Sequence, residues 1–312
     1  GDRPVKKLKV AVIGVGYLGR FHAQKYASMV DVDLVGVVDI DRARAEHVAH
    51  EVETAAYTCL ADIPEPLDAV SIAVPTSSHA DVAIPLLEKG VAVLLEKPIS
   101  SSIEEALAII EASRAGGPVL QIGHLERFNP ALLELRGSIT HPMFIEAHRI
   151  SPFKPRGTDV DVILDIMIHD IDIILSLVDS PVASLEAVGV PVLTSSADIA
   201  NARLRFESGC IANITASRVS ADVMRKIRIF QPDAYFSIDF ARSAVDVYTL
   251  TPDRQIDHRH ISMSESDALA SEIRSFVDAV RHRTEVVVDG TAGLKALEMA
   301  YTIKNALVIP AR

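Results

Sequence analysis

The pattern of apolar and polar residues changes once along this chain of 312 residues. Up to about residue 124, short uninterrupted apolar runs alternate with longer segments of helical periodicity. Apolar runs without polar interruption are typical of parallel strands that are buried on both faces, and their alternation with helices predicts an α/β fold. The predicted strands occupy residues 9–13, 33–38, 68–74, 91–95 and 118–122.

After residue 124 the expected strands are longer, follow one another directly and alternate polar with apolar side chains, as half-buried antiparallel strands do. They lie at residues 143–150, 199–206, 210–216, 225–230, 234–240 and 245–250, and helices at about 266–282 and 293–307 follow. We therefore predict two domains, 1–124 with a parallel sheet and 125–312 as an α+β domain with a mostly antiparallel open sheet. Because an open sheet face usually needs a partner, we expect a homodimer or homotetramer.

Three glycines with the spacing G-x-G-x-x-G follow the first predicted strand. Gly14 allows a tight turn, Gly16 lets backbone approach a pyrophosphate, and Gly19 allows close packing of the next helix on the strand. The phosphates would lie on the free N–H groups of the helix that starts near Tyr17 and Leu18. This context predicts a Rossmann dinucleotide-binding site, whereas the alternative is an ordinary βαβ unit with incidental glycines.

Asp39 ends the second predicted strand, 20 residues after Gly19, where an acid is expected to bind the ribose 2′-hydroxyl. Its charge would repel a 2′-phosphate, so the sequence favours NAD over NADP, and Arg42 weakens this preference only slightly. Further polar clusters follow the other predicted strands: Pro75–His79, Glu96–Pro98 and Gly123–Asn129. Since ligands gather at the carboxyl ends of parallel strands, these clusters predict a cofactor site along one sheet edge.

Two stretches offer acid–base chemistry. Lys97 directly follows a strand at the predicted ligand edge, where an ammonium can stabilise a developing alkoxide; the alternative is a solvated loop lysine. Asp165, His169 and Asp172 lie at i, i+4 and i+7 of an otherwise apolar helix, with Asp170 expected at the surface. A histidine oriented by an aspartate suits a general base, and a structural network or a helix cap is the alternative reading.

Composition excludes several classes of function. The net charge of −11 and the pI of about 5.5 argue against a nucleic-acid partner, and no apolar run is long enough for a membrane span. We expect a cytoplasmic protein, because the N-terminal residues contain no signal-peptide apolar region and Cys59 and Cys210 form neither a disulfide framework nor a zinc motif. Asp165 and His169 alone give weak grounds for a metal site, so we expect none.

Taken together, these motifs resemble the glucose-fructose oxidoreductase/inositol dehydrogenase/rhizopine catabolism (GFO/IDH/MocA) family. The elements that carry the resemblance are Gly14-x-Gly16-x-x-Gly19-x-x-His22, Asp39, Pro75-Thr76-x-x-His79, Glu96-Lys97-Pro98 and Asp165-x-x-x-His169. The resemblance implies a two-domain NAD(P)-dependent dehydrogenase of sugars or cyclitols in which Lys97, Asp165 and His169 carry catalysis, with the base either Lys97 or His169. It also implies that the cofactor is bound by Gly14, Gly16, Tyr17, Leu18, Gly19, Asp39, Pro75, Thr76, His79, Glu96 and Lys97.

One departure from the family pattern and one narrower likeness concern the substrate. Many members have glycines around the Asp-x-x-x-His element, whereas this chain has Leu164 and Met167. The segments 123–130 and 167–172 resemble the branch that oxidises the 3-hydroxyl of nucleotide-linked amino sugars such as UDP-N-acetylglucosamine. The substrate contacts that we predict are Arg127, Asn129, Arg149, Arg156, Asp165 and His169. A dehydrogenase of a free sugar, cyclitol or sugar phosphate and a non-catalytic NAD(H)-sensing protein are the alternatives.

Overall fold

The computed structural model describes residues 6–64, 66–154, 160–263 and 267–310. The chain divides into two compact units, residues 1–125 with 268–294 and residues 126–267 with 295–312. The predicted second domain, 125–312, is therefore not one continuous unit, because residues 268–294 pack with the first. None of the helices in the described ranges is both long enough and apolar enough to cross a membrane.

A six-stranded parallel sheet forms the centre of the first unit in the described residues. Its strands are β1 (Leu8–Ile13), β2 (Val32–Val38), β3 (Ala56–Tyr57), β4 (Ala69–Ile72), β5 (Ala92–Glu96) and β6 (Leu120–Gly123), in the spatial order β3-β2-β1-β4-β5-β6. This is the Rossmann arrangement, and it confirms the predicted α/β class. All five sequence-predicted strands are present, with β3 as an additional short edge strand.

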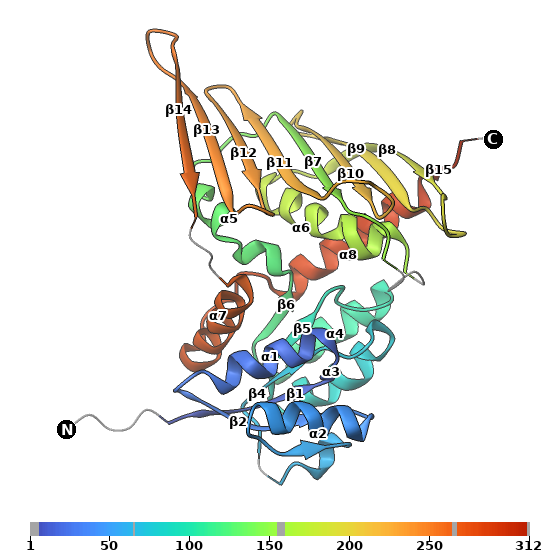
Figure 1. Cartoon of the computed structure of the whole chain (residues 1–312), viewed down its shortest axis with the longest axis vertical. Helices are drawn as coiled ribbons and strands as arrows, with labels where there is room; N and C mark the ends of the chain where they lie inside the picture. Colours follow the sequence, from blue (N-terminus) through green and yellow to red (C-terminus); the bar gives the residue numbers. More distant parts are fainter. Residues whose placement is uncertain (1–5, 65, 155–159, 264–266, 311–312) are drawn as a thin grey trace. The chain divides into compact units, whose positions relative to one another are not determined.

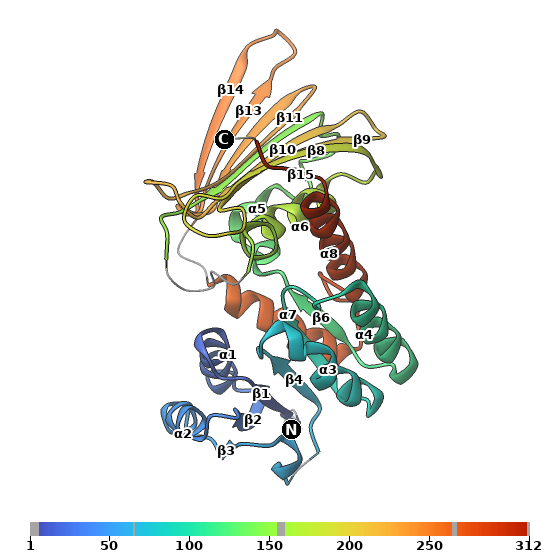
Figure 2. The same ribbon diagram turned by 90° about the vertical axis from the view of Figure 1, so that its right-hand side faces the viewer.

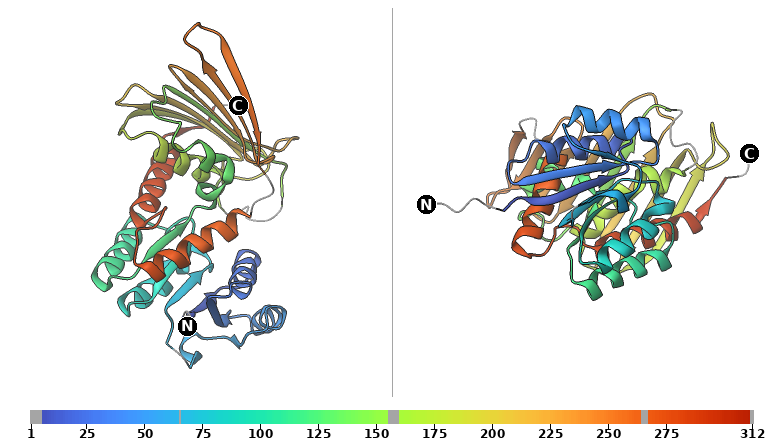
Figure 3. Two further views of the ribbon diagram at one scale, coloured as in Figure 1. Left: turned by 90° about the vertical axis from the view of Figure 1, so that its left-hand side faces the viewer. Right: turned by 90° about the horizontal axis from the view of Figure 1, so that it is seen from below.

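Helices cover both faces of this sheet (Figures 2 and 3). Helices α1 (Tyr17–Ala27), α2 (Arg42–Glu51) and α7 (Ala268–His282) share one apolar core with β1, which includes Val12, Tyr26 and Phe276. Helices α3 (His79–Glu88) and α4 (Ile103–Gly116) lie on the other face, and the short turns η1 (Leu60–Asp62) and η2 (Thr76–Ser78) complete the unit. Asp41 caps α2 by accepting a hydrogen bond from the Arg44 N–H at 3.1 Å, which is the capping expected of an aspartate.

The second unit contains a nine-stranded sheet in the described residues, with the order β14-β13-β12-β11-β7-β10-β9-β8-β15. Its pairings are antiparallel except β7 with β10 and β8 with β15, so the prediction of a mostly antiparallel sheet is confirmed. The strands are β7 (Phe144–Ile150), β8 (Val182–Val190), β9 (Ile199–Phe206), β10 (Ile211–Ser217), β11 (Met224–Gln231), β12 (Ala234–Asp239), β13 (Ala244–Leu250), β14 (Ile256–Ser262) and β15 (Leu307–Val308).

Helices of the second unit lie on a single face of this sheet (Figure 1). They are α5 (Pro130–Leu135), the π-helical turn η4 (Ile163–Met167), α6 (Ile168–Leu177) and most of α8 (Gly290–Asn305), with the turn η3 (Leu125–Phe128) preceding α5. Alternate residues of β7, such as Ile145 and Ala147, are buried against these helices. The intervening residues lie on the face that the helices leave uncovered.

Candidate active site

The loop after β1 has the backbone geometry that a dinucleotide pyrophosphate requires. Gly14 has φ +82°, and a Cβ added at Gly19 would lie 1.7 Å from the Gly14 carbonyl oxygen, so side chains are excluded there. A Cβ added at Gly16 would meet no protein atom within 4 Å, which leaves open space beside this backbone. The first turn of α1 has no side-chain cap, and Tyr17 and Leu18 are exposed on it. Free N–H groups beside open space form a site that fits the cofactor phosphates.

Asp39 follows β2 and is buried beside the glycine loop. Its carboxylate accepts hydrogen bonds from the Val15 N–H at 3.0 Å and the Asp41 N–H at 2.9 Å, so one side chain fixes both the loop and the start of α2. The arginine next to it is Arg44, whose Nη1 lies 3.3 Å from Asp39 Oδ1, rather than the Arg42 considered from the sequence. The acid is thus at the sheet edge where a ribose-binding group is expected.

The segment after β4 is held in place by His79. The buried imidazole lies 3.0 Å from the Val74 carbonyl oxygen through Nε2 and 3.3 Å from the Ile99 carbonyl oxygen through Nδ1. Burial lowers the pKa of His79, and these carbonyls offset part of that change. The ring therefore joins the loop of Pro75 and Thr76 to the loop after β5, and its contact with the cofactor stays a prediction.

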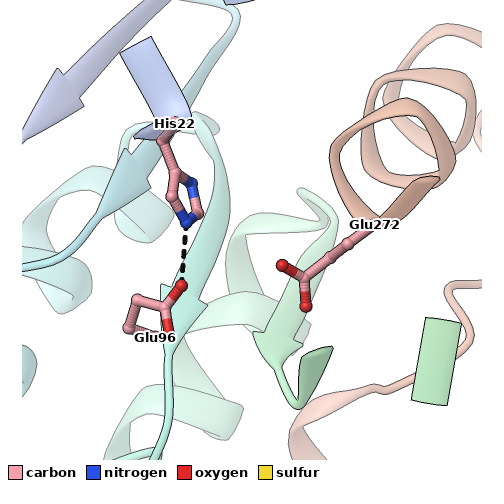
Figure 4. A group of neighbouring side chains, drawn as sticks. All are labelled: His22, Glu96 and Glu272. Atoms are coloured by element: carbon pink, nitrogen blue, oxygen red, sulfur yellow. Dashed lines mark hydrogen bonds and ion pairs between the residues drawn. The ribbon is translucent and has the colours of Figure 1, made fainter. Parts of the chain in front are cut away.

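Glu96 and Lys97 are adjacent in sequence but differ in their surroundings. Glu96, the last residue of β5, points into the first unit, where His22 Nε2 donates to its Oε1 at 2.8 Å (Figure 4). The other ring nitrogen of His22 is 3.0 Å from Ser71 Oγ, which lies 2.8 Å from the Tyr26 hydroxyl. The contact of Glu96 with the cofactor stays a prediction, and Lys97 begins the loop at the carboxyl end of the strand.

Asp165 and His169 lie on consecutive helical segments of the second unit. Asp165 belongs to the π-helical turn η4, and His169 is the second residue of α6, so the predicted continuous α-helix is wrong at its start. The Asp161 carboxylate accepts from the Ile163 and Leu164 N–H groups, both at 3.0 Å, and thereby caps η4. Both candidate residues are partly exposed on segments that are otherwise largely buried, and π-helical turns are frequent at functional sites.

Asp170 is buried, not exposed as predicted. Arg149 Nη2 donates to its Oδ1 at 2.9 Å, and Arg149 Nη1 donates to Glu126 Oε1 at 3.1 Å. Burial raises the pKa of Asp170, and the Arg149 guanidinium offsets part of that rise. The guanidinium also lies over the Phe240 ring, 5.8 Å from its centroid. Arg149 therefore links the sheet to α6 through Asp170 and to η3 through Glu126, and its substrate contact stays a prediction.

The remaining predicted substrate contacts have mixed surroundings. Arg127 Nη1 donates to Asp172 Oδ1 at 3.3 Å, and its side chain is 12% exposed. The Asn129 side chain accepts from the Ala131 N–H at 3.0 Å and so caps α5. Arg156 lies outside the described residues. The structure thus groups Arg127 and Asp172 with α6, and it gives Asn129 a local capping function.

Sequence reasoning missed one buried cluster. His22, Glu96 and Glu272 come from α1, β5 and α7, and their ligand atoms lie within 4.8 Å of one another (Figure 4). In the described ranges this is the group of His, Cys, Asp and Glu side chains whose spacing would accommodate a metal ion. The available signal was His22 at the end of the glycine motif, whereas Glu272 had none.

Comparison with known proteins identifies both units. Residues 8–124 match a family model described as an oxidoreductase family with an NAD-binding Rossmann fold, and residues 131–234 match a GFO/IDH/MocA C-terminal domain. The chain is 40% identical over 306 residues to UDP-N-acetylglucosamine 3-dehydrogenase of Acidithiobacillus ferrooxidans, which covers 96% of this chain and 97% of that protein. It is 30% identical over 233 residues to scyllo-inositol 2-dehydrogenase (NAD(+)) of Bacillus subtilis, with 69% and 68% covered.

A solved structure agrees with this likeness. The structure of UDP-N-acetylglucosamine 3-dehydrogenase from Acidithiobacillus ferrooxidans superposes with a TM-score of 0.92 at 40% sequence identity. The match covers 96% of this chain and 98% of that one. The similarity therefore extends through both units.

Proposed function

Because this chain belongs to the GFO/IDH/MocA family of NAD-dependent oxidoreductases, we propose that it oxidises C3 of a nucleotide-linked amino sugar such as UDP-N-acetylglucosamine. The observation that carries this substrate is the 40% identity to an enzyme named for that reaction, over 96% of the chain. The presence of Lys97, Asp165 and His169 in the pattern of the family supports an active enzyme over a sensor without turnover.

Each residue of the catalytic set has a distinct chemical role in this proposal. Bound NAD supplies the hydride acceptor. Lys97 stabilises the negative charge that develops on the substrate oxygen, and either Lys97 or His169 takes the hydroxyl proton. Asp165 orients His169. The cofactor is held by the glycine loop and by Asp39, whose carboxylate favours NAD.

Arg127 is the substrate-binding candidate that the surroundings favour. Its side chain is partly exposed, and a guanidinium suits a phosphorylated ligand. Arg149 instead contacts the buried Asp170 and the partly exposed Glu126, and Asn129 is engaged as a helix cap. We therefore assign Arg127 to the substrate and treat Arg149 as a support of the helix that carries His169.

We also propose a cytoplasmic homo-oligomer that uses the uncovered face of the nine-stranded sheet. A ladder of stacked rings crosses that face, with centroids of Phe230 and Tyr235 at 4.5 Å and of Tyr235 and Tyr248 at 5.2 Å. Such rings provide large apolar area for contact with a second copy. Light scattering on the eluted protein measures the mass, and a monomer would contradict this proposal.

The test of the function is NADH formation with NAD and UDP-N-acetylglucosamine, compared with glucose and myo-inositol. We expect NADH only with the UDP-sugar. The Lys97→Ala and His169→Ala variants should lose about 10²- to 10⁴-fold in kcat, because each removes a charge-stabilising or proton-transfer group, yet should bind NADH normally. The exposed Lys89→Ala and His141→Ala are matched controls that should leave kcat unchanged.

Each alternative result of these assays has a specific interpretation. NADH formed only from a free polyol would keep the catalytic set and reject the nucleotide-sugar substrate. Wild-type turnover in Lys97→Ala or His169→Ala would reject the assigned roles. NADH binding without turnover of any of the three substrates would favour the sensing alternative.

A further inference from the structure

The cluster of His22, Glu96 and Glu272 is a group of buried ionisable side chains in the first unit. His22 and Glu272 have no exposed surface, and Glu96 is 9% exposed. Glu272 projects from α7 toward the paired His22 and Glu96 side chains (Figure 4). Because charged groups are rarely buried without compensation, their protonation states need an explanation.

Hydrogen-bond donors are too few around Glu272. Neither of its carboxylate oxygens has a hydrogen-bond partner, and Gln121 Oε1 also lacks one. Gln121 Nε2 donates to the main-chain oxygen of Glu272 at 3.2 Å. His22 Nε2 donates its hydrogen to Glu96. The Tyr26 and Ser71 hydroxyls are hydrogen-bonded to each other, and Ser71 is also hydrogen-bonded to His22 Nδ1. Protonation of Glu272 would remove a negative charge that no hydrogen-bond donor stabilises.

The charges around Glu272 also favour its neutral form. Within the described residues Glu272 forms no ion pair with a lysine or arginine. The titratable side chains that face it from the packed elements are Glu96 on β5 and His22 and Tyr26 on α1. Burial, and after it the Glu96 carboxylate, raise the pKa of Glu272 well above its usual range. A negative charge on Glu272 therefore has nothing to balance it.

We propose that Glu272 is held as the neutral acid and acts, with His22 and Glu96, as a positioning residue for Lys97. A neutral Glu272 leaves Glu96 as the single negative charge of the cluster and preserves its hydrogen bond to His22. That bond fixes the end of β5, and the next residue is Lys97. The role as a positioning residue rests on the function proposed above for Lys97, whereas the protonation state does not.

The packing around Glu96 explains why a shift of this residue would also move Lys97. A Cβ added at Gly123, the partner of Glu96 in β6, would lie 3.0 Å from Glu96 Oε2 and 3.2 Å from its Cα. Glu96 is thus enclosed by His22 on one side and by the β6 backbone on another. An ionised Glu272 would repel Glu96 and displace the strand end that carries Lys97.

The protonation state is tested by the pH dependence of stability. A group whose folded pKa is raised gives stability that is fully present below its unfolded pKa and is lost as pH rises toward the folded pKa. Glu272→Gln mimics the neutral acid and removes this loss. Between pH 5 and pH 8 the unfolding constant of the wild type should therefore rise relative to the variant, by up to about ten-fold per pH unit.

The matched control is Glu285→Gln, the same chemical change at an exposed carboxylate of the first unit. Its unfolding constants, measured by urea titration, should run parallel to those of the wild type. Parallel curves for Glu272→Gln as well would overturn the neutral-acid assignment. Metal analysis of the purified protein is a second check, since about one bound cation per chain that Glu272→Gln abolishes would also overturn it.

The positioning role is tested by kinetics of two isosteric variants. Glu272→Leu removes the donor and should lower kcat about ten-fold, with the NADH dissociation constant unchanged, because a small displacement of a catalytic group is costly. Glu272→Gln retains an N–H donor and should restore most of kcat. Equal kcat in wild type and Glu272→Leu would reject the role. If the wild type has no activity on the UDP-sugar, the proposed function fails, while the stability measurement still decides the protonation state.

Discussion

The two units both bury carboxylates, but they neutralise them by different means. In the second unit Arg149 lies between Asp170 and Glu126, with N···O distances of 2.9 and 3.1 Å. In the first unit Glu96 and Glu272 face His22, and the described structure brings no arginine to Glu272. The cluster of the first unit is balanced by the proton proposed on Glu272, and the cluster of the second unit is balanced by the Arg149 guanidinium.

This difference determines how each cluster responds to change. A guanidinium keeps its charge at every pH at which the protein is folded, so the Arg149 cluster is insensitive to moderate pH change but depends on every partner. A proton on Glu272 leaves its cluster tolerant of neutral isosteres and sensitive to pH. A buried carboxyl group thus supports an element in each unit. Asp170 supports α6 at any pH at which the protein is folded, whereas Glu272 supports β5 only while it is protonated.

The largest expected effect comes from removing the arginine. Arg149→Met leaves the buried Asp170 and the partly exposed Glu126 without a cation and should cost about 3–5 kcal/mol in the free energy of unfolding. Urea unfolding measures this loss, and Arg205→Met, at an exposed residue of β9, is the control. Glu272→Leu should instead cost little at pH 5 and stabilise the protein at pH 8. A loss of equal size in both variants would contradict the contrast between the clusters.

An intermediate effect is expected at the Arg127–Asp172 pair. Asp172→Asn removes the charge that faces Arg127 and should cost about 1–3 kcal/mol, because the hydrogen bond loses the charge of its acceptor. Asp179→Asn, an exposed change shortly after the same helix, should cost almost nothing. Equal unfolding free energies for the two variants would show that the contact between Arg127 and Asp172 does not contribute to stability.

The smallest effect is expected in the chain of neutral groups behind His22. Tyr26→Phe removes the hydroxyl that lies 2.8 Å from Ser71 Oγ and should cost about 0.5–1.5 kcal/mol. The slope of stability against pH should stay that of the wild type, since Glu272 is unchanged. Tyr57→Phe is the control. A changed slope in Tyr26→Phe would indicate that the titrating group is not Glu272.

The sequence was sufficient wherever local backbone geometry dictates the residue. The glycine loop was predicted because a positive φ and a close backbone contact each favour glycine. The parallel and antiparallel sheets followed from the apolar patterns. Strand β14 was missed because its residues, such as Asp257 and His258, are polar and mostly exposed, so no apolar alternation marks it.

Features that depend on distant partners were not predictable in this way. Asp170 was wrongly assigned to the surface because helical periodicity does not reveal Arg149, which lies 21 residues away in sequence on β7. Glu272 approaches Glu96 from a helix near the end of the chain, and no motif connects the two positions. The π-helical form of η4 likewise escaped a periodicity argument that assumes an α-helix.

Residues 268–294 give the nucleotide-binding unit an unusual order of assembly during synthesis. The first 125 residues leave the ribosome without Ile273 and Phe276, which share an apolar core with α1 and β1. They also lack Val288, whose carbonyl oxygen accepts from the Ile122 N–H at 2.9 Å. At about 5–20 residues per second, the nascent sheet waits roughly 10–30 s for these groups. During that interval apolar surface on β1 and α1 remains uncovered. Chaperones would therefore bind the amino-terminal segment of the growing chain.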